Sequence, residues 1–560
     1  MNRSNVHLLD LPDEILLIIL KKLNNIDVLY SLLDINNGRL NILAQENTFT
    51  NILKFVSIDD NPLLDRFSNY ILPRIHHNVK CFILDPILME RTLLAIDYPN
   101  LTELKIFHFH EGTVLNYFTD KSSLRPIFQE QITNLILVNN DQDGMISSLK
   151  TYTTNVYSHI LIFFKNLKNL SIIQPSVLTY YPGLSLCDLP STTFSSSILT
   201  HLYINVKTFD DCVYLLDGRL RKLTTLYVNV YAIDKSSGIV QNTDKLFNLK
   251  CFTLKSLFRF EQYDNIVSLL RRMSYLEKLT LYLRIESRNR VIDGTYVQHD
   301  ILDNMPQLDS FTFYICTYVD MVGLSYKLSS EDIQQAFRQQ HVTSIVNYIN
   351  GDIAACSIFS LPFRFDYLED LGNKFPNIVF SYVVFLLLED INPFKHEFFA
   401  RIARSFPLLK YLRIFNKKSS ILHDGMTLSS DNCQLYSSIE YPHLTRLDVR
   451  YAHRDYVEQF LNETKTYMPS LTELGVVVSH LEYVTKDFKR EETRRNCAKV
   501  KKLLTLEPLV CSKDFWLYFP SSYNLMIFLK YKEISTINDR FLFYKKNHTK
   551  LCDAAELYVH

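Results

Sequence analysis

The chain has 560 residues, of which 47% are hydrophobic, and its 60 Lys and Arg residues balance 60 Asp and Glu residues. A neutral chain has no electrostatic footprint for nucleic acid or an anionic membrane, so we expect neither as a partner. Glycine is scarce, at 12 residues, and the sequence lacks the glycine-rich phosphate-binding motifs, HExxH and GxSxG. We therefore expect no catalytic residue, and no cofactor.

The cysteine pattern and the lengths of the apolar stretches indicate in which cellular compartment the protein works. Ten cysteines are scattered along the chain without a CxxC pair, which is typical of free thiols in a reducing environment. The longest uncharged apolar stretch, Ile378 to Leu388, is too short to span a bilayer. These features predict a protein of the cytoplasm or the nucleus.

The first predicted element is an unusually apolar helix near the N-terminus. Leu11-Pro12-Asp13-Glu14 suits a helix start, because proline fits the first turn and the two acids complement the helix dipole. Six consecutive apolar residues, Ile15 to Leu20, then cover every direction around the helix axis. A unit of this size cannot bury them all. Part of the helix should therefore pack against something outside the unit.

At this point the sequence resembles an F-box. The matching residues are Leu11, Pro12, Glu14, Ile15, Leu16, Ile19, Leu23, Asp27 and Leu32. The second half departs from the family, because Asp34 to Leu40 lacks the usual Arg-Trp pair and the only tryptophan is Trp516. The resemblance implies an F-box over residues 5–52 that docks on a Skp-type adaptor and, through it, a cullin ligase. It further implies adaptor contacts at Leu11, Pro12, Ile15, Leu16, Ile19 and Leu20. Alternatively, this helix caps the first repeat of the body that follows.

One pattern then recurs along the chain: an apolar residue, two variable residues, an apolar residue, a variable residue and a further apolar residue. Successive copies mostly begin 22 to 35 residues apart. Each copy predicts a short strand with one buried face. Copies preceded by proline begin at Leu101, Leu308, Leu409, Leu444 and Leu471; others begin at Val79, Ile132, Leu167, Leu199, Leu223, Leu249, Leu276, Ile378 and Val500.

Amphipathic helices are predicted between several copies. Apolar residues at helical spacing occupy 266–273, 398–406 and 456–461. A strand and a helix repeated in this way cannot bury its own apolar face, so neighbouring units must stack. The pattern resembles the leucine-rich repeat. We expect an α/β solenoid over 75–510, with parallel strands on the concave face, helices on the convex face, an irregular insertion around 316–370 and a C-terminal cap or tail over 511–560.

Two further motifs contain residues suited to metal binding or to anion binding. His108-Phe109-His110-Glu111 places two imidazoles on one face of a strand, but zinc sites need three or four ligands and no third is at a suitable spacing. We expect no metal site there. The run from Lys486 to Lys502 mixes basic and acidic residues, which is typical of a solvated helix face.

The variable positions of the strands predict the binding surface. They should face the concave side, and they are rich in Tyr and Arg, the residue types enriched at binding hot spots. Arg413 should lie close to Asp448, between Arg446 and Arg450, and this basic excess predicts an acidic or phosphorylated target. The predicted target-binding residues are Tyr203, Tyr227, Tyr282, Tyr314, Tyr411, Arg413, Phe415, Arg446 and Arg450.

The function implied by both resemblances is recruitment. An F-box followed by leucine-rich repeats is the arrangement of a substrate receptor of a Skp–cullin–F-box ubiquitin ligase, which holds a target protein for transfer by other subunits. The alternative is a repeat scaffold for protein interactions that is attached to no ligase.

Overall fold

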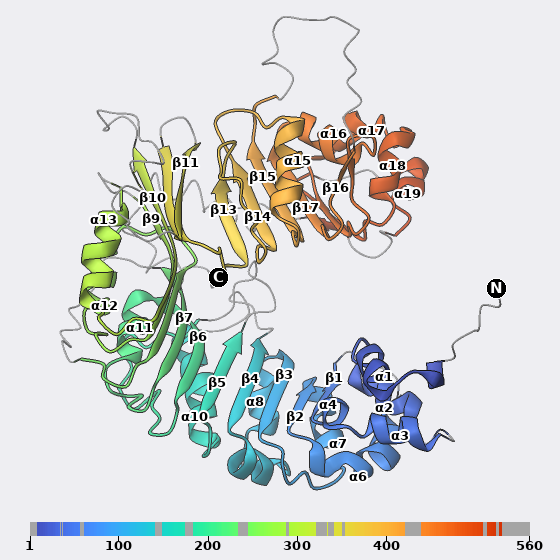
Figure 1. Ribbon diagram of the computed structural model, residues 1–560, viewed down its shortest axis with the longest axis vertical. Coiled ribbons are helices and arrows are strands. Elements are labelled where there is room, and N and C mark those ends of the chain that lie inside the picture. The colour runs from blue at the N-terminus through green and yellow to red at the C-terminus, as the bar shows by residue number, and fades with distance from the viewer. Residues whose placement is uncertain are drawn as a thin grey trace, which may run out of the picture. The chain divides into compact units, whose positions relative to one another are not determined.

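The computed structural model describes residues 8–33, 35, 37–56, 61–139, 148–173, 183–232, 245–286, 291–320, 333, 341–349, 353–419, 438–507, 512–521 and 526–528 (Figure 1). The chain is an α/β protein that divides into two compact units. The first comprises Met1–Leu281 and Ile301–Ser310, and the second comprises Tyr282–Asp300 and Phe311–His560.

Helices form the N-terminal part of the first unit. They are α1 (Asp13–Leu20), α2 (Asn25–Leu32), α3 (Gly38–Ala44) and α4 (Asn47–Thr50). The predicted first helix is confirmed: it contains the whole apolar run from Ile15 to Leu20 and ends there, with Lys21 as its C-cap. Asn24 caps α2 by accepting a hydrogen bond from the Ile26 amide.

A sheet of twelve strands follows, mostly parallel. Its order is β1-β2-β3-β4-β5-β6-β7-β8-β9-β10-β12-β11, and successive pairs from β1 to β8 are parallel. The strands are β1 (Ile52–Phe55), β2 (Cys81–Leu84), β3 (Glu103–Phe109), β4 (Asn134–Asn139), β5 (Asn169–Ile173), β6 (His201–Thr208), β7 (Thr225–Ala232), β8 (Cys251–Ser256), β9 (Lys278–Ile285), β10 (Ser310–Asp320), β11 (Val342–Ile349) and β12 (Ile353–Ser360).

Helices of up to eight residues join these strands. The longer ones are α8 (Glu111–Tyr117), α11 (Phe209–Leu215) and α12 (Tyr263–Leu270). Some connections contain π-type segments: Ile127–Gln131 is one, and Thr153–Ser158 lies between α9 (Leu149–Tyr152) and α10 (His159–Phe163) in one continuous helical run. Apolar side chains at matching register positions form the core of the first unit; they include Leu104, Leu135, Leu170, Leu202, Leu226 and Phe252.

A second sheet of seven parallel strands lies in the second unit. Its order is β13-β14-β15-β17-β19-β20-β21. The strands are β13 (Tyr367–Leu371), β14 (Phe385–Glu389), β15 (Tyr411–Asn416), β17 (Arg446–Ala452), β19 (Glu473–Gly475), β20 (Lys502–Thr505) and β21 (Met526–Phe528). Leucines again share a register row, here Leu368, Leu386, Leu412, Leu447, Leu474 and Leu503, and all are buried.

The repeat predicts where the strands lie. In every predicted copy except the one at Ile378, a strand begins two residues after the first apolar residue. The copy at Ile378 is wrong, because residues 377–384 form a loop with a turn at 381–382 and β14 begins only at Phe385. The predicted break in the repeat over 316–370 corresponds to β12, which pairs antiparallel with both β10 and β11.

The predicted helices at 266–273, 398–406 and 456–461 correspond to α12, α15 (His396–Ser405) and α16 (Arg454–Leu461). Further helices of the second unit are α17 (Val478–Thr485), α18 (Glu491–Cys497) and α19 (Lys513–Tyr518). Most of the predicted tail, 511–560, lies outside the described residues. No helix in the described part of the chain is both long and apolar enough to span a membrane.

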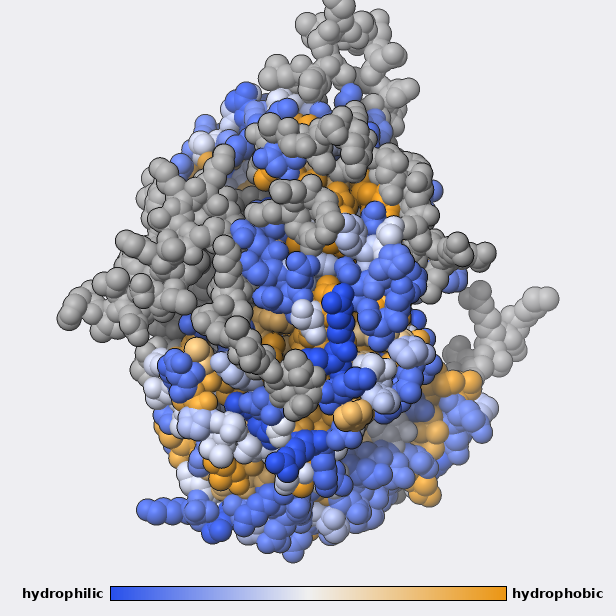
Figure 2. Space-filling model, turned by 90° about the vertical axis from the view of Figure 1, so that its left-hand side faces the viewer, coloured by the Kyte–Doolittle hydropathy of each residue, from blue (hydrophilic) through white to orange (hydrophobic). Residues whose placement is uncertain are grey.

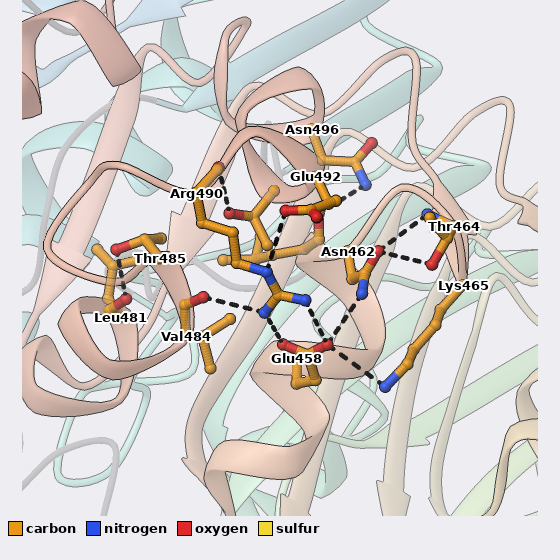
Figure 3. A network of polar contacts seen from close by, with 12 residues as sticks. Glu458, Asn462, Thr464, Lys465, Leu481, Val484, Thr485, Arg490, Glu492 and Asn496 are labelled. Atoms are coloured by element: carbon orange, nitrogen blue, oxygen red, sulfur yellow. Dashed lines mark hydrogen bonds and ion pairs between the residues drawn. The ribbon is translucent and has the colours of Figure 1, made fainter. Parts of the chain in front are cut away.

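The charged run between Lys486 and Lys502 is partly structural. Arg490 donates two hydrogen bonds to Glu458 of α16, at 2.5 and 3.1 Å (Figure 3). Glu458 also contacts Lys465, and it accepts a hydrogen bond from Asn462 (Figure 3). Burial opposes ionisation of Glu458, but these donors hold its pKa below the usual value. The pairing fixes α16 against the segment before α18, so this run is only in part a solvated face.

Candidate functional site

The N-terminal helices leave much of their apolar surface in water. Leu16 is 1% exposed and packs with Leu40 and Leu43 of α3, and Leu20 is also buried. The other side of α1 carries Ile15, Ile18 and Ile19, all exposed, and Ile18 is 56% exposed. One side of α1 therefore packs against the chain, and the other side is exposed to solvent.

Several other apolar residues of this region are exposed as well. We call the exposed set the N-terminal apolar surface: Leu8, Leu9, Ile15, Ile18, Ile19, Leu23, Ile35 and Ile42. Isolated exposed leucines are ordinary, but eight exposed apolar residues within one small helical region are not scattered singly. By contrast, hydrophilic residues predominate in the coloured part of the face drawn in Figure 2.

Arg39 holds the segment that precedes α1. Its guanidinium donates to the carbonyl oxygens of Leu9 and Leu11, at 2.7 and 2.6 Å, and contacts Asp13 at 2.6 Å. These bonds fix the start of α1 against α3, and so position the N-terminal apolar surface. Sequence reasoning missed this role; its signal was a lone arginine where the F-box resemblance expects an Arg-Trp pair.

The same helices also pack on the first strand. The Asn25 side chain donates to the Ile52 carbonyl oxygen at 2.9 Å, and the Arg66 guanidinium lies 4.3 Å from the Tyr30 ring centroid. The helical region therefore adjoins β1 directly, without a linker, and one of its sides covers the edge of the sheet.

Four of the six predicted adaptor contacts are at the surface. Pro12, Ile15 and Ile19 are exposed, and Leu11 is partly exposed. The prediction is wrong for Leu16 and Leu20, because both are buried against the chain itself and cannot touch a partner. Ile18 and Leu23 were not predicted, although both are more exposed than Ile15. A helix period read from Leu16 would have placed Ile18 on the opposite side.

The predicted target-binding residues divide into two groups. Tyr203 and Tyr227 are paired in register on β6 and β7, with stacked rings 5.8 Å apart. Tyr227 is 42% exposed, and Tyr203 is partly exposed. This pair is accessible, as the prediction requires.

The tyrosines further along the sheet are not accessible. Tyr282 and Tyr314 are stacked at 4.7 Å, and Phe365 and Tyr367 lie 5.1 and 4.3 Å from the Tyr282 ring. Burial raises the pKa of both Tyr282 and Tyr314 well above the ordinary value. The prediction that these two tyrosines face a target is wrong, because aromatic residues that follow β12 cover them.

The polar residues of β15, β17 and β19 form what we call the arginine cluster: Tyr411, Arg413, Arg446, Asp448, Arg450, Tyr451 and Glu473. Arg413 pairs in register with Asp448, as predicted, and its Nε lies 3.4 Å from Asp448 Oδ2. Arg450 donates two hydrogen bonds to Asp448, at 2.9 and 2.7 Å. Burial would raise the pKa of Asp448, but Arg413 and Arg450 hold it below the usual range.

Burial contradicts the predicted exposure of this cluster. Arg413 is 6% exposed and Arg450 is 5% exposed, and Tyr411 is buried, whereas Phe415 and Arg446 are partly buried. The physical reason is the buried Asp448, which draws the guanidinium groups down onto the sheet. Sequence reasoning also missed Glu473, which lies 3.5 Å from Arg446 and occupies the same motif position one copy later.

Gly475 makes room for the central ion pair. It is paired in register with Asp448, and a Cβ at this position would lie 2.8 Å from Asp448 Oδ1 and 3.2 Å from Arg450 Nε. Asp448 and Arg450 therefore keep their bidentate geometry because the neighbouring strand has no side chain there.

The motif at His108 forms a pair of a different kind. His108 Nδ1 lies 2.7 Å from Asp85 Oδ1, and His110 caps α8. Within the described ranges, no group of three or more His, Cys, Asp or Glu residues is arranged to hold a metal ion.

No protein-family model matches the sequence, and no curated protein matches it either.

Proposed function

We propose that this chain is the substrate-recognition subunit of an SCF-type ubiquitin ligase. The N-terminal helices act as an F-box and bind the Skp-type adaptor, and the stacked strand–helix units act as a leucine-rich-repeat-like solenoid that holds a target protein. The chain itself catalyses no step; it brings the target to a cullin ligase, whose other subunits transfer ubiquitin.

The observation that carries the proposal is the N-terminal apolar surface. Ile15, Ile18 and Ile19, at i, i+3 and i+4, share one face of α1, and the other side of this helix packs against α3 through Leu16. Burying one such side chain contributes about 1.5–3 kcal/mol, so leaving several exposed is costly unless a partner covers them. A Skp-type adaptor is the partner implied by the residues that resemble an F-box.

The accessible tyrosine pair favours target binding at β6 and β7. Tyr203 and Tyr227 offer apolar ring area and hydroxyl groups on adjacent strands, and His201 beside them is exposed. Tyrosine combines contact area with few rotatable bonds, which suits a protein interface. In this proposal the target contacts β6 and β7 rather than the arginine cluster.

A repeat scaffold outside any ligase is the second candidate. The contact between Asn25 and Ile52 favours it, because a helical region that covers the edge of a sheet can serve as a cap alone. The two candidates differ in what the exposed isoleucines do: the ligase subunit needs them for an adaptor, whereas the scaffold does not.

Affinity purification with mass spectrometry separates the candidates. The wild-type chain should recover a Skp-type adaptor and a cullin, and the double variant Ile15→Asp with Ile19→Asp should lose both while keeping its far-ultraviolet circular dichroism. Leu115→Asp is the matched control, because Leu115 is an exposed apolar residue on α8 of the same unit. Recovery of the adaptor by the double variant would contradict the ligase proposal.

A further inference from the structure

The arginine cluster holds buried guanidinium N–H groups with no hydrogen-bond partner. They are Arg413 Nε and Nη2, Arg446 Nε and Arg450 Nη1. A buried charged donor that loses its hydrogen bond to water and gains none in the protein costs more than a neutral one. Of the buried nitrogen atoms without a partner in the described residues, most belong to this one cluster.

Both acids of the cluster, Asp448 and Glu473, already pair with basic side chains. Asp448 accepts two hydrogen bonds from the Arg450 guanidinium, one from the Arg450 backbone amide and one from the Tyr411 hydroxyl, the last at 3.3 Å. Arg413 Nε is close to Asp448 but out of hydrogen-bonding geometry, and Arg413 Nη2 points to no acceptor. Glu473 is shared between Arg446 and Lys502, at 3.5 and 3.9 Å. Glu473 Oε2 itself makes no hydrogen bond, so Glu473 contributes charge beside Arg446 but leaves the free N–H groups of Arg413 and Arg450 without an acceptor.

Two aromatic rings contact the Arg413 guanidinium but accept none of its hydrogen bonds. Its guanidinium carbon lies 5.2 Å from the Phe415 ring centroid and 5.3 Å from that of Tyr451, and these two rings are stacked. Cation–π contact of this kind stabilises the charge but provides no acceptor for the N–H groups. Glu389, on the neighbouring strand, is paired in register with Phe415 and has a partner of its own.

The charges within the cluster do not balance. Arg413, Arg446 and Arg450 are positive, whereas Asp448 and Glu473 are negative, so one positive charge remains. A tetrahedral oxyanion fits such a site, because planar guanidinium groups bind its oxygen atoms bidentately.

We propose that Arg413, Arg446 and Arg450 bind one small anion of the phosphate class, free or as part of a small molecule. A polypeptide segment is excluded as the occupant because Arg413 and Arg450 are more than nine-tenths buried, so only a compact group reaches them. The Arg446 side chain, 26% exposed, stands at the edge of the site. The proposal rests on the seven-stranded sheet alone, and it is independent of adaptor binding.

Thermal unfolding of the full chain tests the site with inorganic phosphate and pyrophosphate as the probes. Titration at constant ionic strength, with chloride as the reference anion, should raise the melting temperature of the wild type by about 5 °C at a hundredfold excess over Kd. Arg413→Gln should abolish the rise. Arg219→Gln is the control, because Arg219 is buried and pairs bidentately with Asp217 in the other unit; this variant should keep the full rise.

A second variant covers the case in which Arg413→Gln does not fold. Arg446→Gln changes a half-buried residue at the edge of the site, so it should fold and show at least a threefold weaker response to phosphate. Equal responses to phosphate and chloride, or an unchanged phosphate response in Arg446→Gln and Arg413→Gln, would overturn the proposal. Tighter binding of a phosphoserine peptide than of pyrophosphate would overturn the assignment to a small anion.

Discussion

Two pairs of tyrosines lie at variable positions of the strand motif, the first pair at its fifth residue and the second at its seventh, and their surroundings differ completely. Tyr203 and Tyr227, on β6 and β7, are stacked and accessible. Tyr282 and Tyr314, on β9 and β10, are stacked and buried beneath Phe365 and its neighbours. The strand period decides which face of the sheet a side chain occupies, but it does not decide what covers that face.

The arginine cluster extends this comparison to charged residues. Asp448 and Asp13 both pair with arginine, but the Asp448 side chain is fully buried whereas the Asp13 side chain is 53% exposed. Removing one member of an ion pair costs more free energy when the pair is buried, because water cannot solvate the charge that remains. The following predictions use such matched pairs, in order of decreasing effect.

Removing the buried acid should have the largest effect. Asp448→Asn leaves Arg413 and Arg450 buried without a counter-charge and should lower the free energy of unfolding by about 3–5 kcal/mol. Asp13→Asn removes an exposed ion pair with Arg39 and should cost about 0–1 kcal/mol. Urea denaturation followed by circular dichroism measures both, and equal losses would show that burial does not distinguish these pairs.

The two tyrosine positions should differ nearly as much. Tyr282→Ala empties a fully buried site between aromatic rings and should cost about 3–5 kcal/mol, as large-to-small core changes do. Tyr227→Ala, at the accessible position, should cost less than about 1 kcal/mol and should weaken target binding instead. If Tyr227→Ala were the more destabilising change, the assignment of Tyr227 to an exposed binding surface would be lost.

Adding one methyl group beside the ion pair should have an intermediate effect. In Gly475→Ala the new Cβ meets Asp448 Oδ1, and the shift that this requires should cost about 1–3 kcal/mol. Gly38→Ala is the matched control, because no atom lies within 4 Å of a Cβ placed there; its melting temperature should stay close to that of the wild type. An unchanged free energy of unfolding in Gly475→Ala would mean that the Asp448–Arg450 ion pair can shift without loss of stability.

The pH dependence of stability should be the smallest of these effects. The pKa of Asp448 is depressed in the folded protein, so its contribution is complete above the unfolded value of about 3.9 and is lost as pH falls towards the folded value. The difference in stability between the wild type and Asp448→Asn should therefore shrink below pH 4, by at most about 1.4 kcal/mol per pH unit. A difference that grows in acid would reverse the assigned sign.

The sequence predicted strand positions well because each copy carries its own apolar period. Leu104, Leu226 and Leu447 each occupy the buried row, and each follows from the motif alone. The failure at Ile378 has a local cause: Val383, Phe385 and Leu387 extend the apolar run, so several registers satisfy the same pattern. Strands β1 and β13 were missed because their sequences lack the complete motif.

Side-chain exposure could be predicted only in part. The apolar excess of α1 did indicate an exposed surface, since no helix of that size buries six consecutive apolar residues. Which of Leu16 and Ile18 is buried depends on where α3 packs, and the sequence of α1 alone does not show this. Likewise, the pairing of Arg413 with Asp448 followed from register, whereas the burial of that pair depends on residues distant in sequence.

The central claim is that the N-terminal apolar surface binds a Skp-type adaptor. Its most direct test is an equilibrium titration of the purified full chain with purified adaptor, using the wild type and the double variant Ile15→Asp with Ile19→Asp. We expect the wild type to bind and the double variant to bind at least about a hundredfold more weakly, since two interface anchors are each worth more than about 1 kcal/mol. A wild-type chain that does not bind the adaptor, or a double variant that binds equally well, would contradict the claim.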